Sequence, residues 1–130
     1  MTRTLYHSGM AILAAVDDLL FSSKIRATAK QVGVDVQFAR TPDEILAQAR
    51  TLKPALAIFD LNSGKTDPLA TIAALKADPE IGAVRTIGFV SHVHTELIAA
   101  ARRAGADEVM PRSAFAGRLA DILLSGAQRS

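Results

Sequence analysis

Residues 56–61 read Leu-Ala-Ile-Phe-Asp-Leu, an almost continuously apolar run with one carboxylate near its end. A run of this kind is typical of a strand buried on both faces of a parallel sheet. Four more apolar runs recur along the chain, and a helix-like segment separates each run from the next. The five runs lie at residues 11–16, 34–39, 56–61, 86–90 and 108–110. This alternation predicts an α/β protein, a three-layer, doubly wound sandwich built on a five-stranded parallel sheet.

The second run has a different pattern from its neighbours. Val34, Val36 and Phe38 alternate there with the polar residues Asp35 and Gln37, as in a strand with one solvated face. We therefore expect an edge strand at this position, with the first, third and fourth runs in the centre of the sheet.

Apolar residues between the runs recur at spacings of three and four, which places each set on one helical face. The sets are Phe21, Ile25, Ala29 and Val32; Ile45, Ala49 and Leu52; Leu69, Ile72 and Ala73; and Leu119, Ile122 and Leu123, in a last helix expected from about Ala116. Thr41-Pro42-Asp43-Glu44 is a capping box with proline at the first helical position, so it predicts a helix start. Gly33 and Gly105 stand where the first and fourth helices should end.

Length and composition indicate one globular domain. The chain has 130 residues, of which 49% are hydrophobic and 22% charged, so it can bury a core and does not resemble a disordered chain. We expect an irregular extension at residues 1–9, the domain at 10–124 and a short tail at 125–130. The apolar stretch 11–16 ends at Asp17, too early for a signal peptide or a membrane span.

Cysteine content and net charge limit the cellular compartments and the classes of partner that we expect. The chain has no cysteine, which excludes disulfides, thiolate metal sites and thiol catalysis and is compatible with the cytoplasm. Its 15 basic and 13 acidic residues give a net charge of only +2, so neither nucleic acid nor a membrane is expected as a partner. The arginines of the last third are interpreted as solvated helix surface; they are Arg102, Arg103, Arg112, Arg118 and Arg129.

Polar side chains follow the predicted strands at their carboxyl ends, where open parallel sheets collect functional groups. Asp17 and Asp18 follow the first strand, Asp60 ends the third, Ser91 follows the fourth and Arg112 follows the fifth. Residues that are far apart in the sequence are therefore expected to converge on one acidic pocket.

Three neighbouring carboxylates would repel one another unless a cation lies among them. Mg²⁺ is the expected cation, because it takes oxygen ligands and keeps several waters; Asp17, Asp18, Asp60 and a backbone carbonyl near Asn62 are the expected ligands. Asp60 could then attack phosphorus and form an acyl phosphate, with Ser91 and Arg112 holding the phosphoryl oxygens.

At these positions the chain resembles the response-regulator receiver family of two-component signalling, which is CheY-like and flavodoxin-like in fold. The resemblance covers residues 10–124 and rests on an ordered set of short motifs. These are Val16-Asp17-Asp18, Ile58-Phe59-Asp60-Leu61-Asn62, Gly88-Phe89-Val90-Ser91 and Gly105-Ala106-Asp107-Glu108.

The resemblance implies a strand order of 2-1-3-4-5 and a signalling switch rather than an enzyme, with at most self-phosphorylation and autodephosphorylation. A sensor histidine kinase or a phosphotransfer protein would phosphorylate Asp60, with Mg²⁺ organised by Asp17 and Asp18. A separate effector would dock on the face of helix four, strand five and helix five, and a weak homodimer would be compatible with it.

The chain departs from the family at several positions. Arg112-Ser113 stands where the family has Lys-Pro, and Arg differs from Lys in needing room for a planar fork. His92 follows Ser91 in place of a small residue, Val109 replaces an aromatic, and the loop at 61–66 lacks the common Met-Pro. A phosphorylation-independent, receiver-like interaction module is therefore the alternative.

Other chemistries fit less well. Gly64-Lys65-Thr66 lacks the glycine that a P-loop needs five residues before its Gly-Lys pair. Ser91 with His92 or His94 as base is a poor catalytic pair, because neighbouring strand-end residues point apart. The two histidines lack a third metal ligand, and a flavin- or nucleotide-binding protein would need a phosphate-binding loop.

Overall fold

The structure is a computed structural model that describes residues 11–91 and 94–128. Its five strands form one parallel sheet in the order β2-β1-β3-β4-β5, which confirms the predicted fold class and strand order. The strands are β1 (Ile12–Ala15), β2 (Val36–Phe38), β3 (Leu56–Asp60), β4 (Arg85–Val90) and β5 (Glu108–Pro111). The helices are α1 (Leu19–Val32), α2 (Pro42–Leu52), α3 (Pro68–Ala77), α4 (Thr95–Ala104), α5 (Arg112–Gly117) and α6 (Leu119–Gln128).

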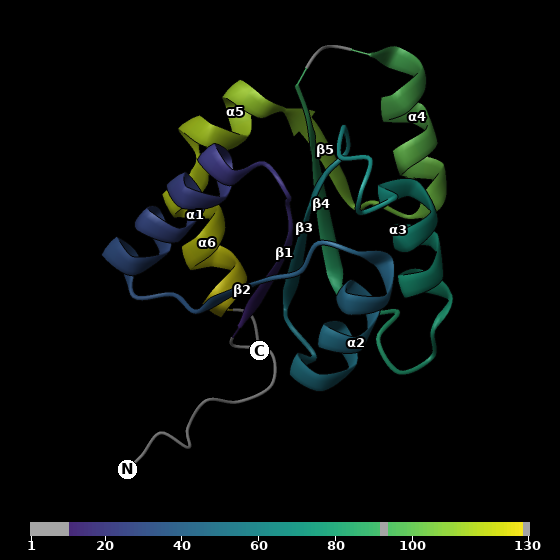
Figure 1. The fold of residues 1–130 in the computed structure, drawn as a ribbon, viewed down its shortest axis with the longest axis horizontal. Coiled ribbons are helices and arrows are strands. Elements are labelled where there is room, and N and C mark those ends of the chain that lie inside the picture. The colour runs from purple at the N-terminus through teal and green to yellow at the C-terminus, as the bar shows by residue number, and fades with distance from the viewer. Residues whose placement is uncertain (1–10, 92–93, 129–130) are drawn as a thin grey trace.

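The helices cover both faces of the sheet, with α1, α5 and α6 on one side and α2, α3 and α4 on the other (Figure 1). Alternate residues of the central strands point to opposite faces and are buried on both, which explains their continuous apolar runs. Ile12 and Ile58 belong to the core under α1 and α6, whereas Leu13 and Phe59 belong to the core under α2 and α3.

Strand β2 lies at the edge of the sheet and is only partly buried, as its alternating pattern predicted. It begins at Val36 and not at Val34, because the Val34 N–H is still bonded to the end of α1. The Val34 N–H donates to the Ala29 carbonyl at 2.9 Å, and Gly33 adopts a left-handed conformation with a φ of 73°. Together these contacts end the helix, with Gly33 at the predicted position.

The predicted helix start at Thr41 is present, but only one half of the capping box forms, because Glu44 binds the N–H of Arg40 and not that of Thr41. Thr41 Oγ1 accepts a hydrogen bond from the Glu44 N–H at 3.2 Å, and Glu44 Oε1 accepts one from the Arg40 N–H at 2.7 Å. Gly105 ends α4 with a φ of 119°, also as predicted. These local signals place the helix boundaries because they satisfy backbone groups that the helix itself leaves unpaired.

The last helix differs from the prediction in two ways. It consists of two helices, α5 directly after β5 and α6 from Leu119, with a break at Arg118 whose N–H donates to the Ala114 and Phe115 carbonyls. Residues 125–128, expected as tail, continue α6: Ala127 packs on the core, and a side chain at Gly126 would come within 2.7 Å of Leu56. The expected extension at residues 1–9 lies outside the described residues.

None of the helices in the described part of the chain is both long and apolar enough to span a membrane.

Candidate functional site

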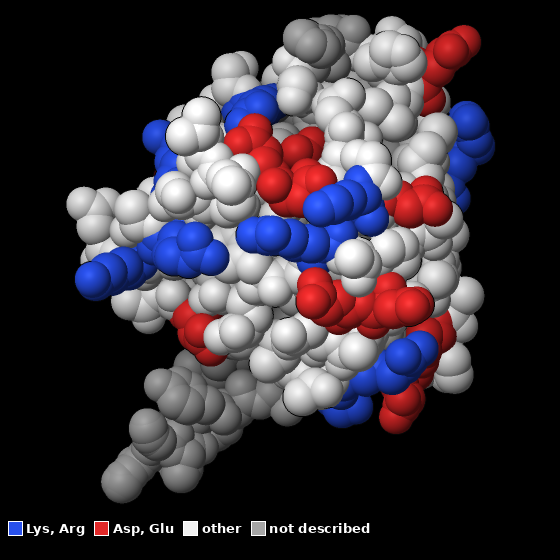
Figure 2. Space-filling view, in the orientation of Figure 1, with Lys and Arg blue, Asp and Glu red and all other residues white. Residues whose placement is uncertain are grey.

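The polar residues predicted at the strand ends lie at or just after the carboxyl ends of the strands. These ends of the sheet are at the top of Figure 1. Asp60 is the last residue of β3 and is only 6% exposed. Asp18 follows β1 as the N-cap of α1, Ser91 follows β4, and Arg112 begins α5 directly after β5. On the face shown in Figure 2, acidic side chains gather in one group in the upper middle and another in the lower middle, and basic side chains lie between the two groups.

Asp18 has two roles at this edge. Its Oδ1 accepts hydrogen bonds from the backbone N–H groups of Leu20 and Phe21 at 3.0 and 3.1 Å, which caps α1. Its Oδ2 accepts a hydrogen bond from Arg112 Nη2 at 3.0 Å, within an ion pair. The Phe21 N–H and the Arg112 guanidinium therefore hold the pKa of Asp18 below its ordinary value.

Arg112 is held by a second contact besides its pairing with Asp18. The guanidinium carbon lies 4.3 Å from the centroid of the Phe21 ring, in a cation–π arrangement. Phe21 is itself fixed in the core by ring contacts with Phe89 and Phe115, with centroids 5.0 and 5.9 Å away. The planar guanidinium thus uses both its edge and its face, as a lysine ammonium could not.

The pKa of Asp60 is set by its burial and by the charges and hydrogen bonds around it. Burial raises its pKa above the ordinary value, and the negative charges of Asp17 and Asp18 act in the same direction. The Asn62 N–H, which donates to Asp60 Oδ1 at 3.0 Å, and the positive charge of Arg112 oppose this rise. The carboxylate is therefore destabilised in its ionised form.

Asn62 links Asp60 to the end of β4. Its backbone N–H binds Asp60, while its side-chain oxygen accepts a hydrogen bond from the Ser91 N–H at 2.7 Å. The predicted residues therefore meet as two connected groups, Asp18 with Arg112 and Asp60 with Asn62 and Ser91. The two groups also interact through charge, because Arg112, Asp17 and Asp18 shift the pKa of Asp60.

The loop after Asp60 is ordered by its own hydroxyl groups. Ser63 Oγ accepts a hydrogen bond from the Thr66 N–H at 3.3 Å, and Thr71 Oγ1 donates to the Thr66 carbonyl at 2.7 Å. Asp67 then begins α3 in a left-handed conformation with a φ of 45°. This loop needs no Met-Pro pair, because serine and threonine side chains supply the local hydrogen bonds.

In the described part of the chain, the three expected carboxylates do not form one side-chain cluster. Within residues 11–91 and 94–128, no group of three or more His, Asp or Glu side chains is arranged to hold a metal ion. Asp18 is paired with Arg112, and Mg²⁺ binding at these residues stays a prediction. His92 lies outside the described residues, and His94 caps α4 through Nδ1, which accepts a hydrogen bond from the Leu97 N–H at 3.2 Å.

At the opposite edge of the sheet, Asp107 connects three elements in a way that the sequence analysis missed. Its Oδ2 accepts hydrogen bonds from Lys76 Nζ at the end of α3, at 2.9 Å, and from the Thr86 N–H in β4, at 2.8 Å. Burial raises the pKa of Asp107, but the hydrogen bonds from Lys76 and Thr86 outweigh this effect and lower it overall. The motif Gly105-Ala106-Asp107-Glu108 was recognised, but nothing in it indicates these partners.

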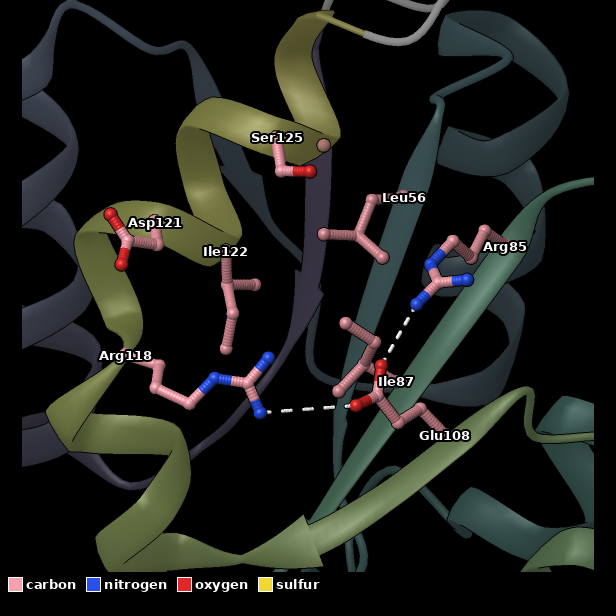
Figure 3. A pocket seen from close by; sticks show the side chains of 9 residues that line it. Leu56, Arg85, Ile87, Glu108, Arg118, Asp121, Ile122 and Ser125 are labelled. Carbon is pink, nitrogen blue, oxygen red and sulfur yellow. Dashed lines mark hydrogen bonds and ion pairs between the residues drawn. The ribbon is translucent and has the colours of Figure 1, made fainter.

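A pocket of about 300 Å³ at the same edge was also missed; it lies between α6 and the starts of β3, β4 and β5 (Figure 3). Leu56, Ile87, Ile122 and Gly126 form its apolar part, and Arg85, Glu108, Arg118, Asp121 and Ser125 form its polar part. Glu108 lies between two guanidinium groups, 2.8 Å from Arg85 Nη2 and 3.9 Å from Arg118 Nη1. The pocket is far along the strands from Asp60.

Comparison with known proteins shows similarity in structure. No protein-family model matches the chain, and no curated protein matches it. A response regulator from Hahella chejuensis has a TM-score of 0.81 at 17% identity, over 92% of this chain and 96% of that one. The chemotaxis response regulator CheY4 of Vibrio cholerae has a TM-score of 0.76 at 17% identity, over 89% of this chain and 97% of that one. The Mn²⁺-bound form of response regulator Rcp1 has a TM-score of 0.73 at 15% identity, over 92% of this chain and 96% of that one. The chain therefore has the fold of the response-regulator receiver domains.

Proposed function

We propose that this chain is a receiver module of two-component signalling that accepts a phosphoryl group on Asp60. The position of Asp60 carries the proposal: a buried carboxylate ends the central strand β3, beside Asp17, Asp18 and Arg112. The receiver-like fold supports the same interpretation. A capping or structural role alone would not require a carboxylate whose ionised form is destabilised by burial.

The phosphoryl transfer uses the oxygen of Asp60 that does not accept the Asn62 N–H. The Asn62 N–H holds Oδ1, so the ionised Oδ2 attacks the phosphorus of a phosphohistidine. The bond between phosphorus and the donor nitrogen breaks, the nitrogen keeps the electron pair, and an acyl phosphate forms on Asp60. The Ser91 hydroxyl and the Arg112 guanidinium then donate hydrogen bonds to phosphoryl oxygens.

The side chains around Asp60 have donor atoms that suit Mg²⁺, because every expected ligand supplies a hard oxygen. Asp17, Asp60 and the backbone carbonyl near Asn62 would hold the ion, and Asp18 would join them once Arg112 leaves its Oδ2. Bound there, the ion supplies positive charge that offsets the carboxylates and the incoming phosphoryl group. The metal in Rcp1 supports a divalent ion in this fold.

The partners that this function requires are proteins. A histidine kinase or a phosphotransfer protein supplies the phosphoryl group, and an effector binds the face formed by α4, β5 and α5. Both encounters would take place in the cytoplasm, and a weak homodimer is compatible with the same face. The domain itself contributes self-phosphorylation and autodephosphorylation at most.

Intact mass spectrometry tests the proposed function directly. The chain is incubated with acetyl phosphate and Mg²⁺, in parallel with an Asp60→Asn variant and a sample in EDTA. We expect a Mg²⁺-dependent gain of one phosphoryl group in the unchanged chain and none in the variant or in EDTA. Asn cannot form the acyl phosphate, so a gain in the variant would place the phosphoryl group elsewhere.

A folded chain that gains no phosphoryl group from acetyl phosphate or from a phosphorylated histidine kinase would overturn phosphorylation at Asp60. The phosphorylation-independent interaction module would then be the function that remains.

A further inference from the structure

The pocket between α6 and the starts of β3, β4 and β5 has an apolar floor and a charged rim (Figure 3). Leu56, Ile87 and Ile122 form the floor, and each of them is at most 6% exposed. Gly126 belongs to the same wall, because the absence of a side chain lets α6 lie directly on Leu56. A recess of this kind removes the apolar part of a ligand from water, which favours binding.

The rim of the pocket has one carboxylate between two guanidinium groups. Glu108 Oε1 accepts a hydrogen bond from Arg85 Nη2 at 2.8 Å, so these two charges balance each other. Arg118 Nη1 lies 3.9 Å from Glu108 Oε2, which is too long for a hydrogen bond. Among the described residues, none accepts a hydrogen bond from the Arg118 guanidinium, and this side chain is 57% exposed. Its donors are therefore available to a ligand.

The fourth charged side chain of the pocket does not cancel this positive charge. Figure 3 shows the Arg118 guanidinium directed across the pocket toward Glu108, whereas the Asp121 carboxylate points away from the pocket, to the outer side of α6. The charges that face the pocket are therefore those of Arg85, Arg118 and Glu108, with one positive charge in excess. This excess favours an anionic ligand over a neutral or cationic one.

We propose that this pocket binds a small carboxylate with an apolar body. The carboxylate pairs with Arg118, whose planar fork suits two carboxylate oxygens, and the body lies on Leu56 and Ile122. The volume of about 300 Å³ accommodates about ten atoms, since a water molecule in the liquid occupies about 30 Å³. An acid of the size of hydrocinnamate fits this volume, whereas a nucleotide is too large. The site is separate from Asp60 and takes no part in phosphoryl transfer.

Amide NMR spectra of the isotope-labelled chain, recorded during a titration with hydrocinnamate at constant ionic strength, test the proposal. We expect saturating shifts at Leu56, Ile87 and Ile122, with a dissociation constant on the order of a few millimolar for a ligand of this size. Hydrocinnamyl alcohol has the same body without the charge and should bind on the order of tenfold more weakly. Acetate has the charge without the body and should give no saturating shift at these residues.

Arg118→Gln should weaken the binding of hydrocinnamate on the order of tenfold, because the paired charge is removed. Arg102→Gln is the matched control: it removes the same charge from an exposed position on α4, on the other side of the sheet, and should bind as the unchanged chain does. Glu108→Gln should act in the opposite direction and tighten binding about two- to fivefold, because the negative charge that faces Arg118 is removed.

The same spectra show whether each variant folds, and Glu108→Gln provides the second test if Arg118→Gln does not fold. Equal affinities for the acid and the alcohol would overturn carboxylate recognition. Shifts that do not saturate, or equal affinities of Arg118→Gln and the unchanged chain, would overturn the site itself. None of these outcomes depends on the phosphorylation of Asp60, so the proposed function and this site are tested separately.

Discussion

Asp18 stabilises the start of α1 and also balances the charge of Arg112, and these two contributions use different oxygens. The capping contact depends on an oxygen acceptor, which asparagine also provides. The ion pair depends on the negative charge, which asparagine lacks. Substitution can therefore separate the two contributions at one position.

We expect Asp18→Asn to change the free energy of unfolding by less than about 1 kcal/mol, the usual range for a partly exposed ion pair. Asp18→Ala should cost about 1 kcal/mol more than Asp18→Asn, because it also removes the acceptor for the Leu20 and Phe21 N–H groups. Both variants lose the same charge, so their difference measures the cap. Urea unfolding followed by circular dichroism at pH 7 gives both values, and equal stability of the two variants would show that the cap contributes nothing.

At the scale of secondary-structure elements, one carboxylate connects α3, β4 and β5 at the amino-terminal ends of the strands. Asp107 precedes β5 and binds Lys76 at the end of α3 and Thr86 in β4. Thr86 is fully buried, so its N–H has no access to water. Lys76 Nζ also donates to the Val84 carbonyl at 2.6 Å, which ties the loop before β4 to the same group.

Asp107→Ala should lower the free energy of unfolding by about 2 kcal/mol, since it leaves the buried Thr86 N–H without its side-chain acceptor. The neighbouring Glu108→Ala is the control: it removes a partly exposed ion pair with Arg85 and should cost less than about 1 kcal/mol. Thermal and urea unfolding of the two variants provide the comparison. If Glu108→Ala were the more destabilising of the two, the assignment of Asp107 as the connecting residue would be wrong.

At the scale of the whole molecule, the buried carboxylate of Asp60 in the central strand lowers the stability of the fold when it is ionised. Asp60 ends β3, a strand that is buried along its whole length. Burial raises its pKa above 3.8, so folding favours the protonated form. The stabilising effect of protonation is fully present below the unfolded pKa and is lost as pH rises through the folded value.

Asp60→Asn should therefore stabilise the metal-free protein at pH 7, by about 1 kcal/mol, because it removes a buried charge while keeping an acceptor for the Asn62 N–H. The advantage of the variant over the unchanged chain should grow as pH rises above 3.8 and disappear at lower pH. Urea unfolding in EDTA between pH 3 and pH 7 measures it. A difference that is constant across this range would contradict a raised pKa.

The sequence by itself determined the sheet, its edge strand and the edge at which the polar residues gather. Hydrophobic periodicity reports which faces are buried, and caps such as Thr41 and Gly33 satisfy local backbone groups. Both signals act over a few residues, so they can be read without the rest of the chain. The placement of Asp60 and Asp18 at strand ends followed from the same local patterns.

Only the tertiary structure decided which of these side chains meet. Arg112 pairs with a residue 94 positions away, and this pairing occupies one oxygen of Asp18, an expected metal ligand. The break at Arg118 and the continuation of α6 past Ser125 depend on packing against the sheet, where Gly126 lies directly on Leu56. Such contacts are set by the distances between elements in space, which local periodicity does not encode, because each pattern describes one face of one element.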